Sequence, residues 1–364
     1  MHSPRFIIAA LLFCCVLYGA PLGATAPNYK AARSLGQRAA ERAAGLLDLQ
    51  WERQKVVALT NAKFARPGGF SSRGCLDGLA TETGTSTGSS TLLSLQSRFD
   101  QPLWFAFYSS ESGKCAYLQA DRESAEAALS GKEPRGPVFV IKQTARIDAE
   151  YIMEHARKFR AKAENGLFGD NLFRVVTCAN AAMKNSPDDL LTAIQTHDHY
   201  CPGVTSGVLM VRFIRERILS GASEADCFVL SLEPWCKEDA LTTLLNATPG
   251  KRGYGTVYPT KQEAENWPEP LSRADTIVFL KHGSQPWRGW MLRFDFDKAN
   301  RMFSGQKTDS PIVNKLAMDM WFADYLDEPE LFVDQVGSVE LEEGRSPKAL
   351  LSPGSDPVKI LSGK

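Results

Sequence analysis

The sequence predicts an α+β protein that consists of two related units, and three observations lead to this prediction. In each half of the chain, a helix, a strand, a short helix and further strands follow one another. The two halves also share a weak internal similarity. The chain has 364 residues and a hydrophobic content of 43%, which is enough for two cores. We therefore expect a first unit at residues 27–145, which is a degenerate copy, and a second unit at residues 146–340.

In the first half, residues 29–47 are rich in alanine, with leucine, arginine and glutamate between, which predicts an amphipathic helix. The β-branched run at residues 55–60 predicts a strand. A helix is expected at residues 147–163. Further strands are expected at residues 103–108, 115–119, 137–142 and 171–176.

The second half repeats this order. Apolar residues at helical spacing predict a helix over residues 204–219. A short helix is expected to begin near Pro234, with acidic residues in its first turn. Beyond residue 340 the chain is rich in Glu, Gly, Ser and Pro, so residues 341–364 are expected to form a flexible tail. Strands are expected at residues 227–232, 276–281 and 290–296.

The internal similarity can be followed through three segments. Residues 56–59 align with residues 228–231, and residues 75–79 align with residues 236–240 with an offset of one. The loop at residues 83–88 then corresponds to the loop at residues 248–250. The first half contains no equivalent of His197 and His199. We interpret this pattern as a tandem repeat in which the first copy has degenerated.

The N-terminal segment predicts export. Arg5 precedes an apolar run over residues 6–18, and small residues follow at positions 20, 24 and 26. The run is too short to span a bilayer, so residues 1–26 are interpreted as a signal peptide. The protein is therefore expected to be periplasmic or extracellular, without membrane insertion after the signal is cleaved.

Charge and cysteine content exclude several classes of protein. Lys+Arg and Asp+Glu both number 42, so nothing predicts a nucleic-acid partner. The sequence has no CxxC pair, which argues against a zinc ribbon and a thioredoxin-like centre. In an oxidising compartment a disulfide that involves Cys236 is an alternative to a metal site. Six cysteines follow the predicted signal: Cys75, Cys115, Cys178, Cys201, Cys227 and Cys236.

The most informative stretch lies at residues 196–203. His197, His199 and Cys201 stand at i, i+2 and i+4, a spacing that places all three on one side if the backbone is extended. Pro202 suits the first position of the following helix. Cys201 is then expected at the helix N-cap, where the helix dipole favours a thiolate. A cysteine in that position is a candidate metal ligand or nucleophile.

Cys236 begins a second helix in the same half. If the second half folds as one unit, the two cysteines and the two histidines supply the nitrogen and sulfur donors that suit zinc, and also copper, nickel or iron. Asp239 is expected as a fifth donor, as an acceptor that fixes a histidine tautomer, or only as an acidic residue in the first turn of the helix. The predicted metal ligands are therefore His197, His199, Cys201 and Cys236.

Two polar loops are candidates for ligand contacts. Thr248 and Lys251 belong to a turn that faintly resembles an anion-binding loop, although it lacks the spacing of a P-loop. We expect this turn to line the site and to contact a small acidic ligand. Residues 84–90 are small and polar, and are expected to border a ligand cleft between the two halves.

These motifs together resemble the E-subunit family of formylmethanofuran dehydrogenase. The resemblance rests on His-x-His-x-Cys-Pro-Gly, on Cys-x-x-Asp-Ala and on a Thr/Gly loop that ends in Gly-Lys. It covers about residues 185–300 and has a weaker echo over residues 29–120. The resemblance implies compact α+β units with helices on a mostly antiparallel sheet. The family is associated with molybdenum or tungsten enzymes of one-carbon metabolism, a chemistry that an exported member is not expected to perform.

The sequence leaves three functions open. The first is an exported protein that binds or delivers a transition metal, or a small ligand that contains one. The second is an enzyme that uses a metal-activated water, or Cys201 as nucleophile with His199 as base. The third is a disulfide-stabilised structural module. The oligomeric state also stays open, with a homodimer as one option.

Overall fold

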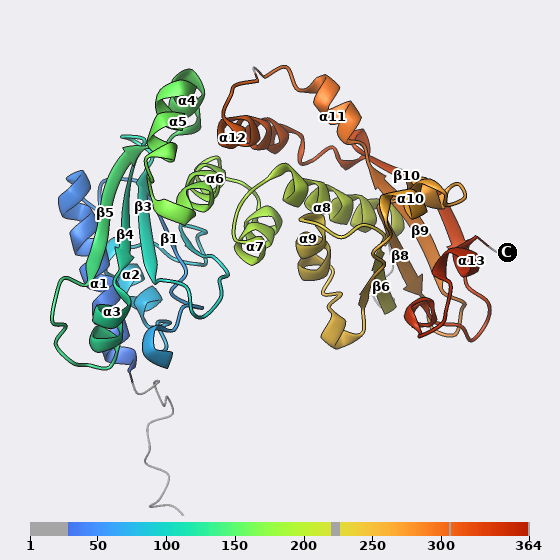
Figure 1. Ribbon diagram of the computed structural model, residues 1–364, viewed down its shortest axis with the longest axis horizontal. Coiled ribbons are helices and arrows are strands. Elements are labelled where there is room, and N and C mark those ends of the chain that lie inside the picture. The colour runs from blue at the N-terminus through green and yellow to red at the C-terminus, as the bar shows by residue number, and fades with distance from the viewer. Residues whose placement is uncertain (1–27, 220–225, 306, 363–364) are drawn as a thin grey trace, which may run out of the picture.

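The computed structural model describes residues 28–219, 226–305 and 307–362. Two five-stranded mixed sheets with helices packed on them form an α+β protein of two similar units, as the sequence predicts (Figure 1). The predicted signal peptide lies outside the described residues. Among the described helices, none combines the length and apolar character that a membrane span requires.

The first sheet has its one parallel strand pair at an edge. Strand β1 pairs in parallel with β2, and all other neighbours are antiparallel. Helices α1 (Tyr29–Leu47), α2 (Cys75–Thr83) and α3 (Arg122–Leu129) pack on one face, while alternate strand residues face a central core. The strand order is β2 (Leu92–Ser94), β1 (Val56–Thr60), β3 (Trp104–Ser109), β4 (Lys114–Ala120) and β5 (Phe139–Arg146).

The second sheet repeats this topology. Strand β6 pairs in parallel with β7 and antiparallel with β8. Helices α8 (Pro202–Phe213), which continues as a π-helical turn (Ile214–Ile218), and α9 (Lys237–Leu244) cover the face toward the central core. The strand order is β7 (Tyr254–Thr256), β6 (Asp226–Ser231), β8 (Thr276–Lys281), β9 (Arg288–Phe294) and β10 (Val333–Glu340). The shorter helices are α10 (Lys261–Glu265), α11 (Phe296–Met302) and α12 (Pro311–Phe322).

Close helix packing shows which residues of the two units are equivalent. A Cβ atom on Gly36 of α1 would overlap the carbonyl oxygen of Cys75, and a Cβ atom on Gly207 of α8 would overlap that of Lys237. Each unit therefore requires a residue without a side chain at the same place. This equivalence makes Gly74 the counterpart of Cys236. The alignment of residues 75–79 with residues 236–240 predicts the same correspondence, because it carries an offset of one.

A layer of helices connects the two sheets: α4 (Ala149–Glu154), α5 (Ala156–Glu164), α6 (Leu172–Met183) and α7 (Asp188–His197). The prediction of a strand at residues 171–176 is wrong, because this segment begins α6. Leu172, Val175, Val176 and Ala179 recur at helical spacing and are all buried. The central core contains residues from both sheets and from this layer. It therefore joins the two units.

The C-terminal segment differs from the expected flexible tail. It contains a 3₁₀ turn (Pro347–Leu351) and the short helix α13 (Pro357–Leu361). Leu341, Leu350 and Leu361 are buried against the face of the second sheet that is remote from the central core. These three leucines give an otherwise polar segment enough apolar surface to pack.

Candidate metal centre

The segment that carries the predicted ligands is a helix end followed by a helix start. Helix α7 ends at His197, and Asp198 adopts the left-handed conformation with φ 74°. Cys201 is extended at φ −157° and forms the N-cap of α8, with Pro202 in the first turn. The prediction of extended backbone from His197 to Cys201 is therefore wrong, because α7 continues to His197. The turn at Asp198 brings the imidazole of His197 close to the thiol of Cys201.

Three of the four predicted ligands form one group. The Nε2 atom of His197 lies 3.9 Å from the Sγ atom of Cys201. Cys236, at the N-cap of α9, completes the group, and its three candidate ligand atoms lie within 4.8 Å of one another. Gly203 allows this approach, because a Cβ atom there would lie 2.8 Å from the Cβ atom of Cys236.

Asp239 is the acceptor for the ring of His197, which is one of the three roles that the sequence leaves open. The Nδ1 atom of His197 donates a hydrogen bond of 2.7 Å to the carboxylate of Asp239. This bond directs Nε2 of the ring toward the two sulfur atoms, which is how carboxylates fix the tautomer of metal-binding histidines. The imidazole of His197 is 13% exposed and Asp239 is half-exposed, so the group is open to solvent on one side.

His199 lies beside this group and not within it. The ring centroids of His197 and His199 are 4.3 Å apart. The Nδ1 atom of His199 is 2.8 Å from Asp198, whose carboxylate also accepts a hydrogen bond from Arg174. The structure therefore places His197, and not the predicted base His199, next to the thiol of Cys201.

The surroundings of the group shift the pKa values of the two cysteines in opposite directions. Hydrogen bonds with Cys201 and His197 lower the pKa of Cys236 to about 4. The same hydrogen bond with Cys236, together with burial, raises the pKa of Cys201. Burial alone would lower the pKa of His197, but hydrogen bonds with Asp239 and Cys236 raise it to about 9. Because metal ligands must be deprotonated, metal binding would release protons from this group.

The donor set fits a transition metal. One imidazole nitrogen and two sulfurs are the donors that zinc prefers, and three protein ligands leave a fourth position for another group. All six cysteines in the described part of the chain have free thiols. The alternative of a module stabilised by a disulfide at Cys236 therefore has no support in the structure.

The predicted ligand-contacting residues Thr248 and Lys251 lie elsewhere. They belong to the loop and 3₁₀ turn (Pro249–Lys251) that follow the C-terminal end of α9, whereas Cys236 lies at its N-terminal end. The eight residues of α9 separate the two places by about 12 Å. The ammonium group of Lys251 donates a hydrogen bond to Asn246 of the same loop. The structure thus does not bring these residues to the candidate metal centre.

A cleft that the sequence only partly predicts lies on the other side of α7. Ser86 and Thr87 line it, as expected for the polar segment at residues 84–90. Lys63 and Arg73 also line it, although no motif in the sequence identifies them. Thr196 contributes from α7, directly before the ligand His197.

Comparison with known proteins supports the assignment of this region. Residues 196–323 match the family described as FmdE, Molybdenum formylmethanofuran dehydrogenase operon. The matched segment begins directly before His197 and includes all three residues of the candidate metal centre. A search of curated proteins finds no match to the chain.

Proposed function

From the premise that residues 196–323 form an FmdE-like domain, we propose that the protein binds one transition metal ion through His197, Cys201 and Cys236. The observation that carries this proposal is the convergence of one imidazole nitrogen and two sulfurs within 4.8 Å. The site holds the metal, or a small ligand that contains it, for storage or delivery. Zinc is the first candidate, and copper, nickel and iron are the others.

Several contacts support a preformed site. Cys201 and Cys236 begin two helices that pack closely at Gly203. Asp239 holds the ring of His197 in the orientation that metal binding requires. Because two helix starts and a helix end fix the donors, little rearrangement is needed when the metal binds.

A metal-dependent enzyme is the second candidate. His199 supports it, since its ring lies beside that of His197 and its Nδ1 atom is oriented by Asp198. A bound metal would lower the pKa of a water molecule at the fourth position, and His199 would stand near enough to accept a proton. The holding function ranks first, because Lys251 and Thr248 lie at the far end of α9.

Export is part of the proposal and rests on the sequence of residues 1–26. Expression of the full chain in a bacterial host, followed by fractionation and N-terminal sequencing, tests it. A mature protein in the periplasm that begins after position 20 supports export. An uncleaved chain in the cytoplasm contradicts it.

The metal proposal is tested by elemental analysis of the protein purified without added metal or chelator. We expect about one equivalent of metal per chain, lost in each of the variants His197→Ala, Cys201→Ala and Cys236→Ala. Two matched controls, His155→Ala and Cys227→Ala, remove the same chemical groups outside the centre and should keep the metal. No metal after reconstitution with zinc, or equal loss in the controls, contradicts the proposal.

A further inference from the structure

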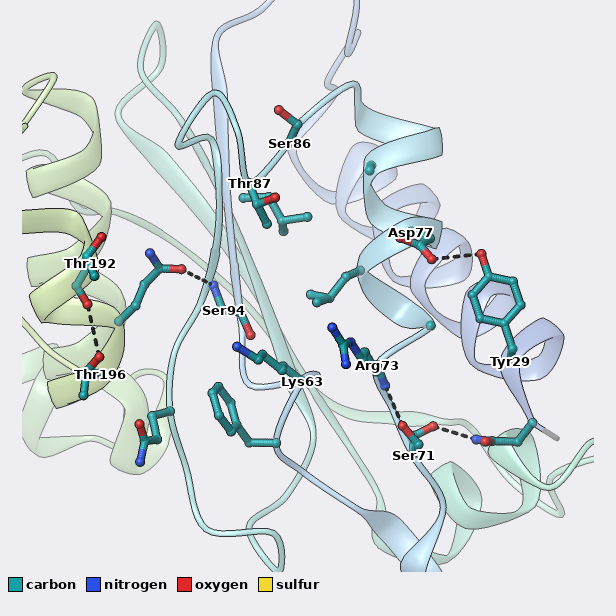
Figure 2. Close-up of a pocket in the computed structure, with 18 residues that line it drawn as sticks. Tyr29, Lys63, Ser71, Arg73, Asp77, Ser86, Thr87, Ser94, Thr192 and Thr196 are labelled. Atoms are coloured by element: carbon teal, nitrogen blue, oxygen red, sulfur yellow. Dashed lines mark hydrogen bonds between the residues drawn. The ribbon is translucent and has the colours of Figure 1, made fainter. Parts of the chain in front are cut away.

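The cleft beside α7 has the size of a ligand site. It has a volume of about 1010 Å³ and lies between α7 on one side and α1, α2 and β2 on the other. Figure 2 shows polar side chains directed into it from both sides. Cavities of this size accommodate small organic molecules.

The cleft includes the counterparts of two residues at the metal centre of the second unit, Cys236 and Asp239. Because Gly36 corresponds to Gly207, Gly74 is the counterpart of Cys236, and Asp77 is the counterpart of Asp239. Both Gly74 and Asp77 line the cleft. In the second unit the carboxylate accepts from His197, whereas Asp77 accepts a hydrogen bond of 2.8 Å from the hydroxyl of Tyr29. The first copy thus keeps the acidic position and lacks the thiol.

Two positive charges lie beside these counterparts. The side chains of Lys63 and Arg73 both point into the cleft (Figure 2). Neither has an acidic partner within 4.0 Å among the residues that the structure describes. Asp77 is the one acidic residue of the described lining, so the cleft carries a net positive charge. Unpaired cations in a concave site attract anions.

A buried hydroxyl provides independent support. Ser94 lines the same cleft and is only 8% exposed, and its Oγ atom has no hydrogen-bond partner among the described residues. Buried polar groups normally have a partner, so an unpaired one calls for an explanation. A ligand oxygen would supply it once the Ser94 hydroxyl turns toward the cleft that this residue lines.

We propose that this cleft binds a small organic anion that carries carboxylate or phosphate groups on a polar body. Arg73 offers the paired donors that recognise such groups, and Lys63 adds a second charge. The hydroxyls of Ser94 and Thr192 are available to the polar body of the ligand, and the hydroxyl of Thr196, which donates to the carbonyl oxygen of Thr192, can accept a hydrogen bond from it. This site is separate from the metal centre and does not depend on it.

Isothermal titration calorimetry on the full-length protein tests the proposal. The probes are citrate for carboxylates, pyrophosphate for phosphates and glucose as an uncharged molecule. We expect saturable binding of at least one anion and none of glucose. In the double variant Lys63→Gln/Arg73→Gln, affinity for that anion should fall by about tenfold or more.

A matched control removes the same charge elsewhere. Lys132 and Arg135 are exposed in the loop between α3 and β5, so Lys132→Gln/Arg135→Gln should leave anion affinity unchanged. Circular dichroism and the thermal midpoint confirm that both double variants fold. The variant Ser94→Ala, in the correctly folded protein, should weaken binding by a smaller factor. The proposal is overturned if neither anion binds, or if both double variants weaken binding equally.

Discussion

The two units show how one scaffold can keep its packing and change its chemistry. Gly36 and Gly207 occupy equivalent positions, and each allows two helices to touch through backbone atoms. The metal site differs, since Gly74 stands where the second unit has Cys236. Packing therefore constrains the helix contact in both copies, while the site residues are free to change.

A second contact between the same helices differs between the two copies. In the second unit Gly203 leaves room for the side chain of Cys236. In the first unit the arrangement is reversed: Ala32 stands where the second unit has Gly203, and Gly74 stands where it has Cys236. A Cβ atom on Gly74 would lie 3.0 Å from the Cβ atom of Ala32. A side chain at position 74 would also lie 2.8 Å from the carbonyl oxygen of Tyr29, so a cysteine there would not fit without a shift of the backbone.

The largest expected effect concerns metal binding, which we assign to the second unit alone. Zinc at about 1,000 times its Kd should raise the free energy of unfolding by about 4 kcal/mol, since it binds only the folded state. Denaturant unfolding with and without zinc measures this increase. The increase should vanish in Cys236→Ala. An unchanged response in that variant would show that zinc binds elsewhere.

The shared helix contact should matter equally in both copies. Gly36→Ala and Gly207→Ala should each lower the free energy of unfolding by about 3 kcal/mol, because the new methyl group meets a carbonyl oxygen. Urea unfolding measures the change. Gly45→Ala is the matched control, because nothing lies near its Cβ position in α1, and it should stabilise the protein by about 0.5–1 kcal/mol. A neutral result at either Gly36 or Gly207 would break the equivalence.

The contact between Gly203 and Cys236 predicts that a side chain at position 203 weakens metal binding. Gly203→Ala should push Cys236 out of position, and should weaken metal affinity by about tenfold while lowering stability by about 1–2 kcal/mol. A competition titration with a chelating dye measures the affinity. The counterpart Gly74→Ala should lower stability and leave metal affinity unchanged. Equal metal loss in both variants would contradict the separation of the two sites.

The smallest expected effect comes from α12, which has no counterpart in the first unit. Asp319 is fully buried, and burial raises its pKa well above the usual value. Its contribution to stability is therefore present below the unfolded-state pKa, near 4, and is lost as pH rises toward the folded-state pKa. Asp319→Asn should nearly match the wild type near pH 4 and be more stable by about 1 kcal/mol at pH 5, since each pH unit between the two pKa values costs the wild type about 1.4 kcal/mol. A difference that is constant between these pH values would contradict this assignment.

Much of the fold could be predicted, because its signals are local. The period of the apolar residues identified α1 and α8, and β-branched runs identified β1 and β8. The start of α6 was misassigned, since Val175 and Val176 favour a strand locally but serve a buried helix face. The parallel pairs β1–β2 and β6–β7 at the sheet edges could not be predicted. They depend on contacts between residues far apart in the sequence, which local composition does not reveal.

The candidate site was predicted in part for a related reason. His197, Cys201 and Cys236 stand out because their spacing and residue types indicate a metal site. His199 belongs to the same predicted motif, but the turn at Asp198 leaves its ring beside that of His197, with Nδ1 turned to Asp198, and not within the group. Lys63 and Arg73 were missed, because single basic residues in loops carry no signal until the fold brings them together.

Because one central core joins the two units, they stay in contact even when the protein is very dilute. Separate copies of a unit fall apart at low concentration, whereas copies in one chain face each other at an effective concentration set by their connection. Because α4 to α7 provide that connection, the first unit stays next to the second however little protein is present. Its ligand-bearing surface could therefore change during evolution without any loss of its neighbour.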